Sequence, residues 1–206
     1  MLCMAGAVLM VGAAVLYLHT RAVMPQAPPG SLSSAAAPSS VRPTQTAVSA
    51  YTVPPDLPKY ISAPDIGIAK SRVVQLGIAK GGVIAAPSNI FDAGWYNGSA
   101  KPGQQGAMFI YGHVSSWTAN GIFYNLKKLH PGNQVLITRG DGRQFTYRVT
   151  SLKTYPSDAV DMSQVLSPVS AGAAGLNLMT CTGTVIKGTS EFSERLVVFT
   201  ILDGTQ

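Results

Sequence analysis

The stretch that decides the fold class is QVLITRGDGRQFTYRVT, residues 134–150. Two runs rich in β-branched and aromatic residues, 134–139 and 144–150, flank the turn-forming residues Gly140, Asp141 and Gly142. Such runs favour pleated strands, and a short connection that contains glycine favours antiparallel pairing between them. The sequence therefore predicts a β-hairpin here.

Further strand-like runs lie on both sides of this hairpin. Residues 107–111 precede it, whereas 176–180 and 196–202 follow it, and segments with Gly, Pro, Asn and Asp separate them. The run 196–202 is almost continuously apolar, as expected for a strand covered on both faces. Between residues 123 and 129, apolar side chains at three-residue spacing predict short helical turns. The sum is a small, mostly antiparallel β barrel with little helix.

The composition limits the possible functions. The chain has 206 residues, of which 15 are Lys or Arg and 9 are Asp or Glu, giving a formal net charge of +6. The basic residues are scattered, whereas nucleic-acid-binding domains concentrate them in a patch or stripe, so we expect no nucleic-acid partner. The apolar content of 46% is too high for a wholly disordered chain and predicts a folded core.

The N-terminal residues have a different character. Residues 2–18 are apolar and uncharged, and as a helix they would be roughly 25 Å long, close to the shortest bilayer span. We interpret residues 1–20 as a single membrane anchor. A secretory signal peptide is the alternative, although its usual basic start is missing. Only Met1 precedes the apolar run, so the flanking charges do not fix the orientation and we expect the natural start upstream.

A linker is predicted over residues 21–58. Eight of the fourteen prolines lie between residues 25 and 58, among Ala, Ser and Thr, with almost no apolar periodicity. Fully extended as a polyproline helix, this segment would reach about 100 Å, enough to lift a domain off a membrane. The remainder, residues 59–206, has the length of one domain.

The two cysteines lie far apart, with Cys3 in the apolar run and Cys181 near the other end. A disulfide between them is not expected, because the Cα atoms of paired cysteines lie within about 7 Å. Cys181 is therefore interpreted as a free thiol. Two explanations stay open at this point: a small buried side chain, or a nucleophile placed where the run 176–180 gives way to a loop.

Nucleophilic cysteine catalysis also needs a proton carrier. His113 follows the run 107–111, and the intervening Gly112 would allow another backbone or a substrate to approach closely. An ordinary loop histidine is the alternative. His130 lies in a turn-like sequence and His19 borders the apolar N-terminal run, so His113 is the better candidate.

A positive group is needed where oxyanion charge develops. Arg195 immediately precedes the run 196–202, so its guanidinium would start at the rim of a buried strand. A surface arginine is the alternative explanation. Polar side chains at the ends of three strands around one barrel could converge on one rim, which would bring Arg195 together with Cys181 and His113.

Together these residues resemble the sortase family. The resemblance is carried by the motif Leu178-Met179-Thr180-Cys181, by Gly112-His113 upstream and by Arg195 ahead of the last apolar run. Four further segments are similar to the actinobacterial-type class E/F of sortases: Gly94-Trp95-Tyr96, Lys101-Pro102-Gly103, Gly121-Ile122-Phe123-Tyr124 and Leu129-His130-Pro131-Gly132.

The resemblance implies a sortase-like eight-stranded β barrel with short helices over residues 59–206, preceded by the transmembrane helix and the linker. It also implies the site: Cys181 as nucleophile, His113 as proton carrier and Arg195 as the group that holds the substrate backbone or the oxyanion. A peptide groove would be walled by three apolar residues, for which core packing beneath a loop is the alternative: Val160, Met162 and Leu166.

The sequence departs from the family at Asn177, where the usual signature has threonine; we interpret this as a tolerable polar change at a strand position. The acidic clusters that bind calcium are missing as well. Asp158 and Asp161 are isolated, whereas calcium generally takes six to eight oxygen ligands. We therefore expect no cofactor and no required metal.

The function implied by the resemblance is that of a cysteine transpeptidase. It would cleave an LPXTG-like sorting signal of a surface protein through a thioacyl enzyme and transfer that protein to an amine of a peptidoglycan precursor or a pilin. The expected location is the cell membrane, crossed once, with the catalytic domain outside the cytoplasm. Two alternatives remain: a non-catalytic binding or scaffold domain on the same fold, and another cell-wall cysteine acyltransferase. L,D-transpeptidases usually place the histidine just before the cysteine, where this chain has Thr180.

Overall fold

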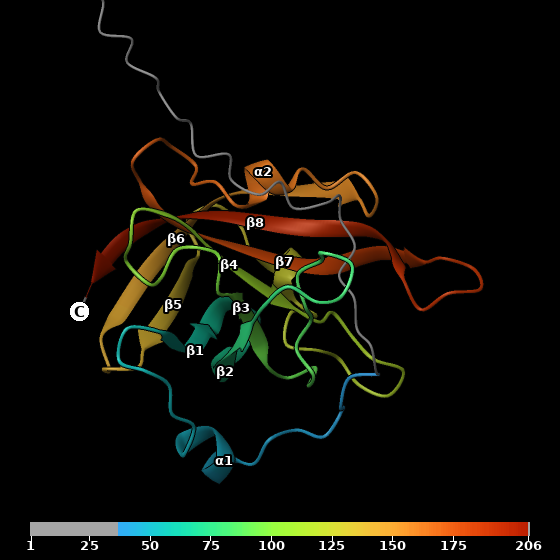
Figure 1. Ribbon diagram of the computed structural model, residues 1–206, viewed down its shortest axis with the longest axis horizontal. Coiled ribbons are helices and arrows are strands. Elements are labelled where there is room, and N and C mark those ends of the chain that lie inside the picture. Colours follow the sequence, from blue (N-terminus) through green and yellow to red (C-terminus); the bar gives the residue numbers. More distant parts are fainter. Residues whose placement is uncertain (1–36, 206) are drawn as a thin grey trace, which may run out of the picture.

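The computed structural model describes residues 37–205, which form a closed β barrel of eight strands with few short helices (Figure 1). The elements are α1 Gln45–Ser49, β1 Pro58–Ala63, β2 Ile68–Leu76, β3 Ala93–Tyr96, β4 Gly106–Gly112, β5 Gln134–Arg139, β6 Gln144–Pro156, α2 Met162–Val165, β7 Ala174–Val185 and β8 Phe192–Thr205, with 3₁₀ turns at Pro64–Ile66 and Leu126–Lys128. The predicted mostly antiparallel barrel is confirmed.

The strands follow one another around the barrel in the order β1-β2-β3-β4-β7-β8-β6-β5. Six of the eight neighbouring pairs are antiparallel, and two are parallel, namely β2 with β3 and β4 with β7. The parallel pairing of β4 and β7 brings together segments about 70 residues apart in the chain. This pairing, with the antiparallel β7–β8 hairpin, positions the candidate site.

The hairpin predicted from the sequence is formed by β5 and β6. Their register pairs Thr138 with Gln144, and the turn residue Gly142 has a φ of +90° that favours glycine. At Gly140, a Cβ atom would lie 2.1 Å from the carbonyl oxygen of Pro54, so a larger residue would push the N-terminal segment away. β6 continues six residues beyond the predicted end because it pairs there with β8.

Two apolar cores lie on opposite faces of the β4–β7–β8 part of the sheet. Ile110, Leu178 and Val198 face the barrel interior, whereas their chain neighbours Tyr111 and Val197 belong to a second cluster on the outer face. The β6–β7 connection with α2 covers that outer face, together with the end of β2 and part of the β2–β3 connection (Figure 1). The apolar run at 196–202 thus has the covering on both faces that the sequence predicts.

Residues 38–57 pack against the barrel. Ser39 forms a β-bridge with Asn89, and the hydroxyl of Tyr60 donates a hydrogen bond of 2.6 Å to the carbonyl oxygen of Val48, which is buried in α1. The last part of the predicted linker 21–58 therefore contacts the domain. The predicted anchor, residues 1–20, lies outside the described residues. None of the helices within 37–205 has the length and apolar character of a membrane span.

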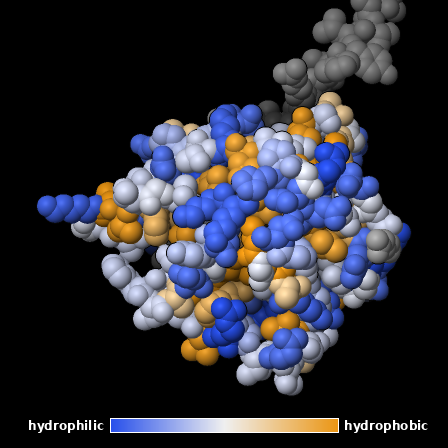
Figure 2. All heavy atoms as spheres, turned by 180° about the vertical axis from the view of Figure 1, so that it is seen from behind, coloured by the Kyte–Doolittle hydropathy of each residue, from blue (hydrophilic) through white to orange (hydrophobic). Residues whose placement is uncertain are grey.

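The outer surface is mixed in character. Figure 2 shows apolar residues interspersed with polar ones on the face opposite that of Figure 1. The most exposed large apolar side chain of the described residues is Trp117, which is 89% exposed in the loop that follows His113.

Candidate active site

The strands β4, β7 and β8 bring the three predicted site residues to one region of the barrel. Across the parallel pair, Tyr111 on β4 is the register partner of Met179 on β7. Across the antiparallel pair, Cys181 is the direct partner of Arg195. Because Cβ atoms of opposed residues lie about 4.5–5.5 Å apart, the thiol and the guanidinium start from adjacent positions.

The strand boundaries differ from those predicted at both residues. Cys181 does not end a strand, because β7 continues to Val185, and Arg195 does not precede one, because β8 begins at Phe192. The β7–β8 pairing extends past the site with an irregular register between residues 182 and 185, and this extension keeps both residues inside the sheet. The site is therefore built on paired strands and not on a flexible rim.

Cys181 carries a free thiol that is partly exposed. Its Sγ lies 3.2 Å from the hydroxyl oxygen of Tyr111, and its side chain packs against the second apolar cluster. Among residues 37–205 this hydroxyl is the one hydrogen-bonding partner of the thiol. Cys181 is therefore neither a fully buried apolar residue nor a freely solvated one.

His113 follows directly after β4, as the sequence predicts. Its Nε2 lies 2.8 Å from the carbonyl oxygen of Pro87, in the β2–β3 connection. Since a carbonyl oxygen only accepts, the proton of the neutral imidazole is on Nε2 and Nδ1 is left as the acceptor. Burial lowers the pKa of His113 below its ordinary value of 6.5, partly offset by the hydrogen bond to Pro87.

Gly112 plays a different part from the one predicted. A Cβ atom at this position would lie 2.5 Å from the ring of Phe123 and 2.8 Å from the side chain of Ile122. The close approach is therefore that of two side chains of the barrel end, and not that of a substrate or another backbone.

Arg195 is buried, with 4% of its surface exposed, so the surface-arginine alternative is excluded. Its Nη1 donates hydrogen bonds of 2.8 Å to the carbonyl oxygen of Phe192 and 3.0 Å to that of Glu194. Its buried Nε has no partner among the described residues. The guanidinium is thus fixed by backbone oxygens while donors remain free to bind an anionic or carbonyl oxygen.

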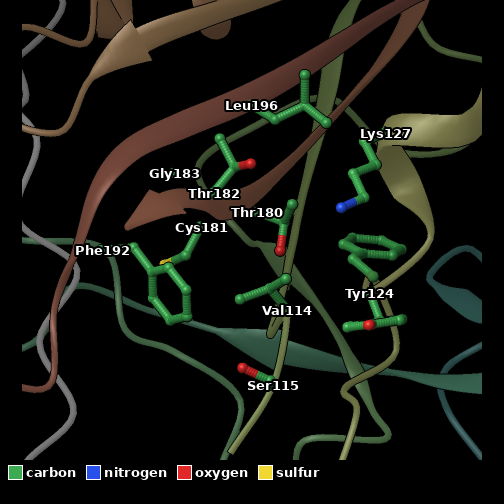
Figure 3. Close-up of a pocket in the computed structure, with 11 residues that line it drawn as sticks. Val114, Ser115, Tyr124, Lys127, Thr180, Cys181, Thr182, Gly183, Phe192 and Leu196 are labelled. Atoms are coloured by element: carbon green, nitrogen blue, oxygen red, sulfur yellow. The ribbon is translucent and has the colours of Figure 1, made fainter. Parts of the chain in front are cut away.

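A pocket of about 160 Å³ opens beside Cys181 at the end of the barrel (Figure 3). Its lining combines aromatic and apolar residues with polar and charged ones, namely Val114, Ser115, Phe123, Tyr124, Lys127, Thr180, Cys181, Thr182, Gly183, Phe192 and Leu196. His113 and Arg195 do not line it. Cys181 therefore lies between this pocket and the second apolar cluster, and the pocket leaves its thiol accessible from one side.

The predicted wall residues belong to the second cluster. Val160 and Met162 are 5% and 8% exposed, and Leu166 packs partly buried against the same cluster. The core-packing alternative therefore describes Val160 and Met162 in this conformation. They belong to the same cluster as Met179, and Cys181 packs against this cluster, which therefore bounds the site on that side.

The roles of two residues in and near the site were not predicted from the sequence. Tyr111 was placed in a predicted strand without a role, although it touches the thiol. Asn177 is fully buried and its Nδ2 donates to the carbonyl oxygens of Val165 (2.7 Å) and Ser167 (2.9 Å), so it holds the end of α2 against β7. A polar residue within an apolar strand run was the available signal for Asn177.

The other candidate histidine and the possible metal ligands of the described residues show no sign of a catalytic or metal-binding role. His130 is exposed, and its backbone N–H donates to the side chain of Asn133, which makes it part of the turn predicted there. Across residues 37–205, no group of three or more His, Cys, Asp and Glu side chains is arranged to hold a metal ion.

Comparisons with known proteins identify the family and the fold. Residues 61–203 match the family described as Sortase domain. Similar solved structures include the sortase SrtA of Actinomyces oris (17% identity, 72% of this chain and 81% of that chain, TM-score 0.54), a pilus-related sortase C of Group B Streptococcus (23%, 72% and 68%, 0.54) and sortase A of Listeria monocytogenes (19%, 73% and 90%, 0.52). No curated protein matches the chain.

Proposed function

Because the chain belongs to the sortase family, we propose that it is a cysteine transpeptidase with Cys181, His113 and Arg195 as its catalytic residues. The observation that carries the proposal is the cross-strand pairing of Cys181 with the buried Arg195. A partly exposed thiol beside a cation with free donors is the arrangement that acyl transfer to sulfur requires.

In the first half of the reaction, the thiolate of Cys181 attacks the carbonyl carbon of a Thr-Gly-like peptide bond in a sorting signal. A neutral imidazole is suited to take the thiol proton, and the lowered pKa of His113 favours that form at neutral pH. The C–N bond then breaks, His113 returns the proton to the departing amine, and a thioacyl enzyme remains.

In the second half, an acceptor amine attacks the thioester carbonyl. His113 takes the proton of the attacking amine, the C–S bond breaks, and Cys181 leaves as a thiolate. The products are a new amide bond and the free enzyme. Water would give hydrolysis at the same step where no amine is bound.

Arg195 would bind the oxygen that becomes negative in both tetrahedral intermediates. Two backbone carbonyls already orient its Nη1, so little reorganisation accompanies the development of charge. Its burial strengthens this interaction, because a cation sheltered from water is screened less.

The surroundings of Cys181 differ on its two sides, and we assign one of the two substrates to each side. The apolar boundary with Val160, Met162 and Leu166 suits the apolar residues of an extended sorting signal. The pocket with Ser115, Lys127 and other polar residues suits an incoming amine acceptor. We further propose that the donors are surface proteins with a C-terminal sorting signal, and that the acceptor is an amine of a peptidoglycan precursor or a pilin.

The proposed location follows from the sequence of the N-terminal residues. An anchor over residues 1–20 would place the enzyme at the cell membrane, crossed once, with the barrel outside the cytoplasm. The contacts of residues 38–57 with the barrel shorten the free part of the predicted linker. The class E/F assignment is part of the same proposal.

The test uses the 206-residue chain in detergent micelles with LPXTG-type and LAXTG-type peptides and an added amine. Mass spectrometry follows the thioacyl enzyme and the ligated product. We expect both species with the wild-type chain and neither with Cys181→Ala. His113→Ala and Arg195→Ala should each lower the rate by a factor of about 10² or more.

Two results would oppose the proposal. If none of the peptides acylates the chain and Cys181 is alkylated no faster than a buried structural cysteine, the domain is a binding or scaffold module. If Cys181→Ala still forms product, another residue is the nucleophile. Melting curves of each variant show whether a lost activity reflects a lost fold.

A further inference from the structure

Tyr111 is the buried residue in closest polar contact with the candidate nucleophile. It lies on β4, is 3% exposed, and its hydroxyl oxygen is 3.2 Å from Sγ of Cys181. Among residues 37–205 its hydroxyl has no other hydrogen-bonding partner. Since buried hydroxyls nearly always have a partner, the orientation of this phenol is set by the thiol.

The strand register explains the contact. Tyr111 is opposite Met179 in the parallel β4–β7 pair, and Cys181 is two residues further along β7 on the same face. The Tyr111 ring therefore reaches diagonally toward the thiol. On its own strand, Tyr111 is two residues before His113, and the two rings meet edge to face with centroids 5.8 Å apart. Tyr111 thus lies between two of the three proposed catalytic residues.

We propose that Tyr111 is a further catalytic residue: its hydroxyl donates a hydrogen bond to Sγ of Cys181, which stabilises the thiolate as the attacking group and again as the leaving group. The proposal rests on the proposed function for its role in turnover, but the contact itself does not depend on any substrate. No proton leaves Tyr111 in either step. The hydrogen bond is strongest to the thiolate and weakest to the thioester sulfur, because only the thiolate carries a full charge.

The direction of this hydrogen bond follows from the surroundings of Tyr111. Burial, followed by the neighbouring thiol, raises the pKa of Tyr111 well above its ordinary value, so the phenol keeps its proton and the sulfur accepts. The other ionisable side chains near the pair, by element, are His113 after β4, Tyr155 on β6, Glu191 in the β7–β8 turn and Arg195 on β8. Arg195 opposes the rise at Tyr111 and Glu191 adds to it, and both effects are smaller than that of burial.

The experiment measures how the alkylation rate of Cys181 depends on pH. It uses the full chain with Cys3→Ser, so that Cys181 is the one cysteine left in the sequence, and iodoacetamide as the probe. Tyr111→Phe keeps the ring and removes the donor. The midpoint of the alkylation profile should rise by about one to two pH units, because a hydrogen bond to a charged group of this kind is lost.

The rate should also show a signature that a merely loosened structure would not give. At neutral pH, alkylation should slow by about tenfold or more, as the thiolate fraction falls. At high pH, where the thiol is fully ionised, it should equal or exceed the wild-type rate, since a more basic thiolate is a stronger nucleophile. The pH profile of kcat/KM for peptide cleavage should move in the same direction as the alkylation profile.

The matched control is Tyr147→Phe. Tyr147 is also fully buried, and its hydroxyl accepts a hydrogen bond of 3.0 Å from the backbone N–H of Gly103, on a different strand from the site. This variant should leave the alkylation midpoint unchanged. An unchanged midpoint in Tyr111→Phe would overturn the proposed hydrogen bond while leaving the transpeptidase function standing. If the midpoint shifts but none of the peptides acylates the wild-type chain, the hydrogen bond stands and the transpeptidase function is overturned.

A second probe covers the case in which Tyr111→Phe does not fold. Ring-fluorinated tyrosine, incorporated at all eight tyrosines, makes each hydroxyl a stronger donor with little change in shape. The alkylation midpoint of Cys181 should then move to lower pH. A midpoint that stays in place with the stronger donor would contradict the inferred hydrogen bond.

Discussion

The hydroxyl of Thr180 donates a hydrogen bond of 2.8 Å to the carbonyl oxygen of Gly112. Both residues are buried, and each immediately precedes a proposed catalytic residue, Cys181 on β7 and His113 after β4. The contact therefore fixes the backbones of these two segments relative to each other, in addition to the pairing of the strands. It supplies a physical role for the threonine in the motif Leu178-Met179-Thr180-Cys181.

Thr180→Val should weaken both stability and activity. Valine has the shape of threonine but leaves the Gly112 carbonyl oxygen buried without a donor, so the free energy of unfolding should fall by about 1–3 kcal/mol. Urea unfolding measures this loss, and peptide acylation measures the effect on the site. Thr180→Ser, which keeps the donor, should retain most of the activity.

Thr200→Val is the control for that comparison. Thr200 is equally buried, on the same strand pair but away from the thiol; its hydroxyl donates to the carbonyl oxygen of Leu176 at 2.7 Å and accepts from the N–H of Leu176 at 3.1 Å. Thr200→Val should therefore lose at least as much stability as Thr180→Val and keep its acylation rate. Equal loss of acylation in both variants would show that Thr180 acts through general stability alone.

Asn177 should control the mobility of the segment that covers the second apolar cluster. Asn177→Ala removes the donors to Val165 and Ser167, which are the polar contacts from β7 to the end of α2. We expect faster amide hydrogen exchange over residues 162–173, because local opening of this segment then has fewer hydrogen bonds to break. Asn177→Thr, the residue usual in the family, has one hydroxyl donor for two carbonyls and should give an intermediate rate. Unaltered exchange in Asn177→Ala would show that apolar packing alone holds this segment.

The elements that the sequence predicted correctly are those with local signals. The β5–β6 hairpin carries its turn residues between its strands, and β4, β7 and β8 carry apolar runs. By contrast, no strand was predicted at β3. It has four residues, Ala93-Gly94-Trp95-Tyr96, and a glycine such as Gly94 is more typical of a loop. In the barrel it is glycine because Leu76 occupies the space: a Cβ atom would lie 2.2 Å from the Leu76 side chain. Such a contact depends on the parallel β2–β3 pairing, which no local pattern specifies.

The same distinction applies to the site. Cys181, His113 and Arg195 were candidates from their residue types and their positions near strand ends, and the resemblance to sortases then implied their roles, because the types and order of these residues are visible in the sequence. The contact of Tyr111 with Cys181 joins residues 70 positions apart and depends on the β4–β7 register. The burial of Arg195 was also hidden, since it results from the extension of the β7–β8 pairing to Phe192.

The ion pair of Arg72 and Asp92 should contribute measurably to stability. Its two hydrogen bonds, Nε to Oδ1 at 2.9 Å and Nη2 to Oδ2 at 2.7 Å, join β2 to the residue that precedes β3, and Asp92 is 5% exposed. Asp92→Asn leaves a partly buried guanidinium without its counter-charge. Because Arg72 keeps some contact with water, we expect a loss of about 2 kcal/mol in thermal or urea unfolding, at the low end for a broken buried pair.

Asp203→Asn is the matched control for Asp92→Asn. It breaks the Arg148–Asp203 pair, whose side chains are 45% and 39% exposed. A solvated pair of this kind adds little to stability, so its loss should be much smaller. Similar losses in the two variants would mean that the burial of Asp92 does not strengthen its ion pair.

His113 should make the stability of the domain depend on pH below about 6.5. Burial lowers its pKa in the folded state beneath the ordinary value of 6.5. Between the two values the unfolded chain binds more protons than the folded chain, so stability is fully present above about pH 6.5 and falls as the pH decreases toward the folded value. His113→Gln, which removes the titrating group and keeps a donor for the Pro87 carbonyl, should flatten this part of the stability profile measured by urea unfolding.

His130→Asn is the control: it removes an exposed histidine and should leave the profile as in the wild type. A profile that is equally steep with His113→Gln would place the acid sensitivity on the carboxylates instead and would show that charging the imidazole at this position costs no more in the barrel than in water.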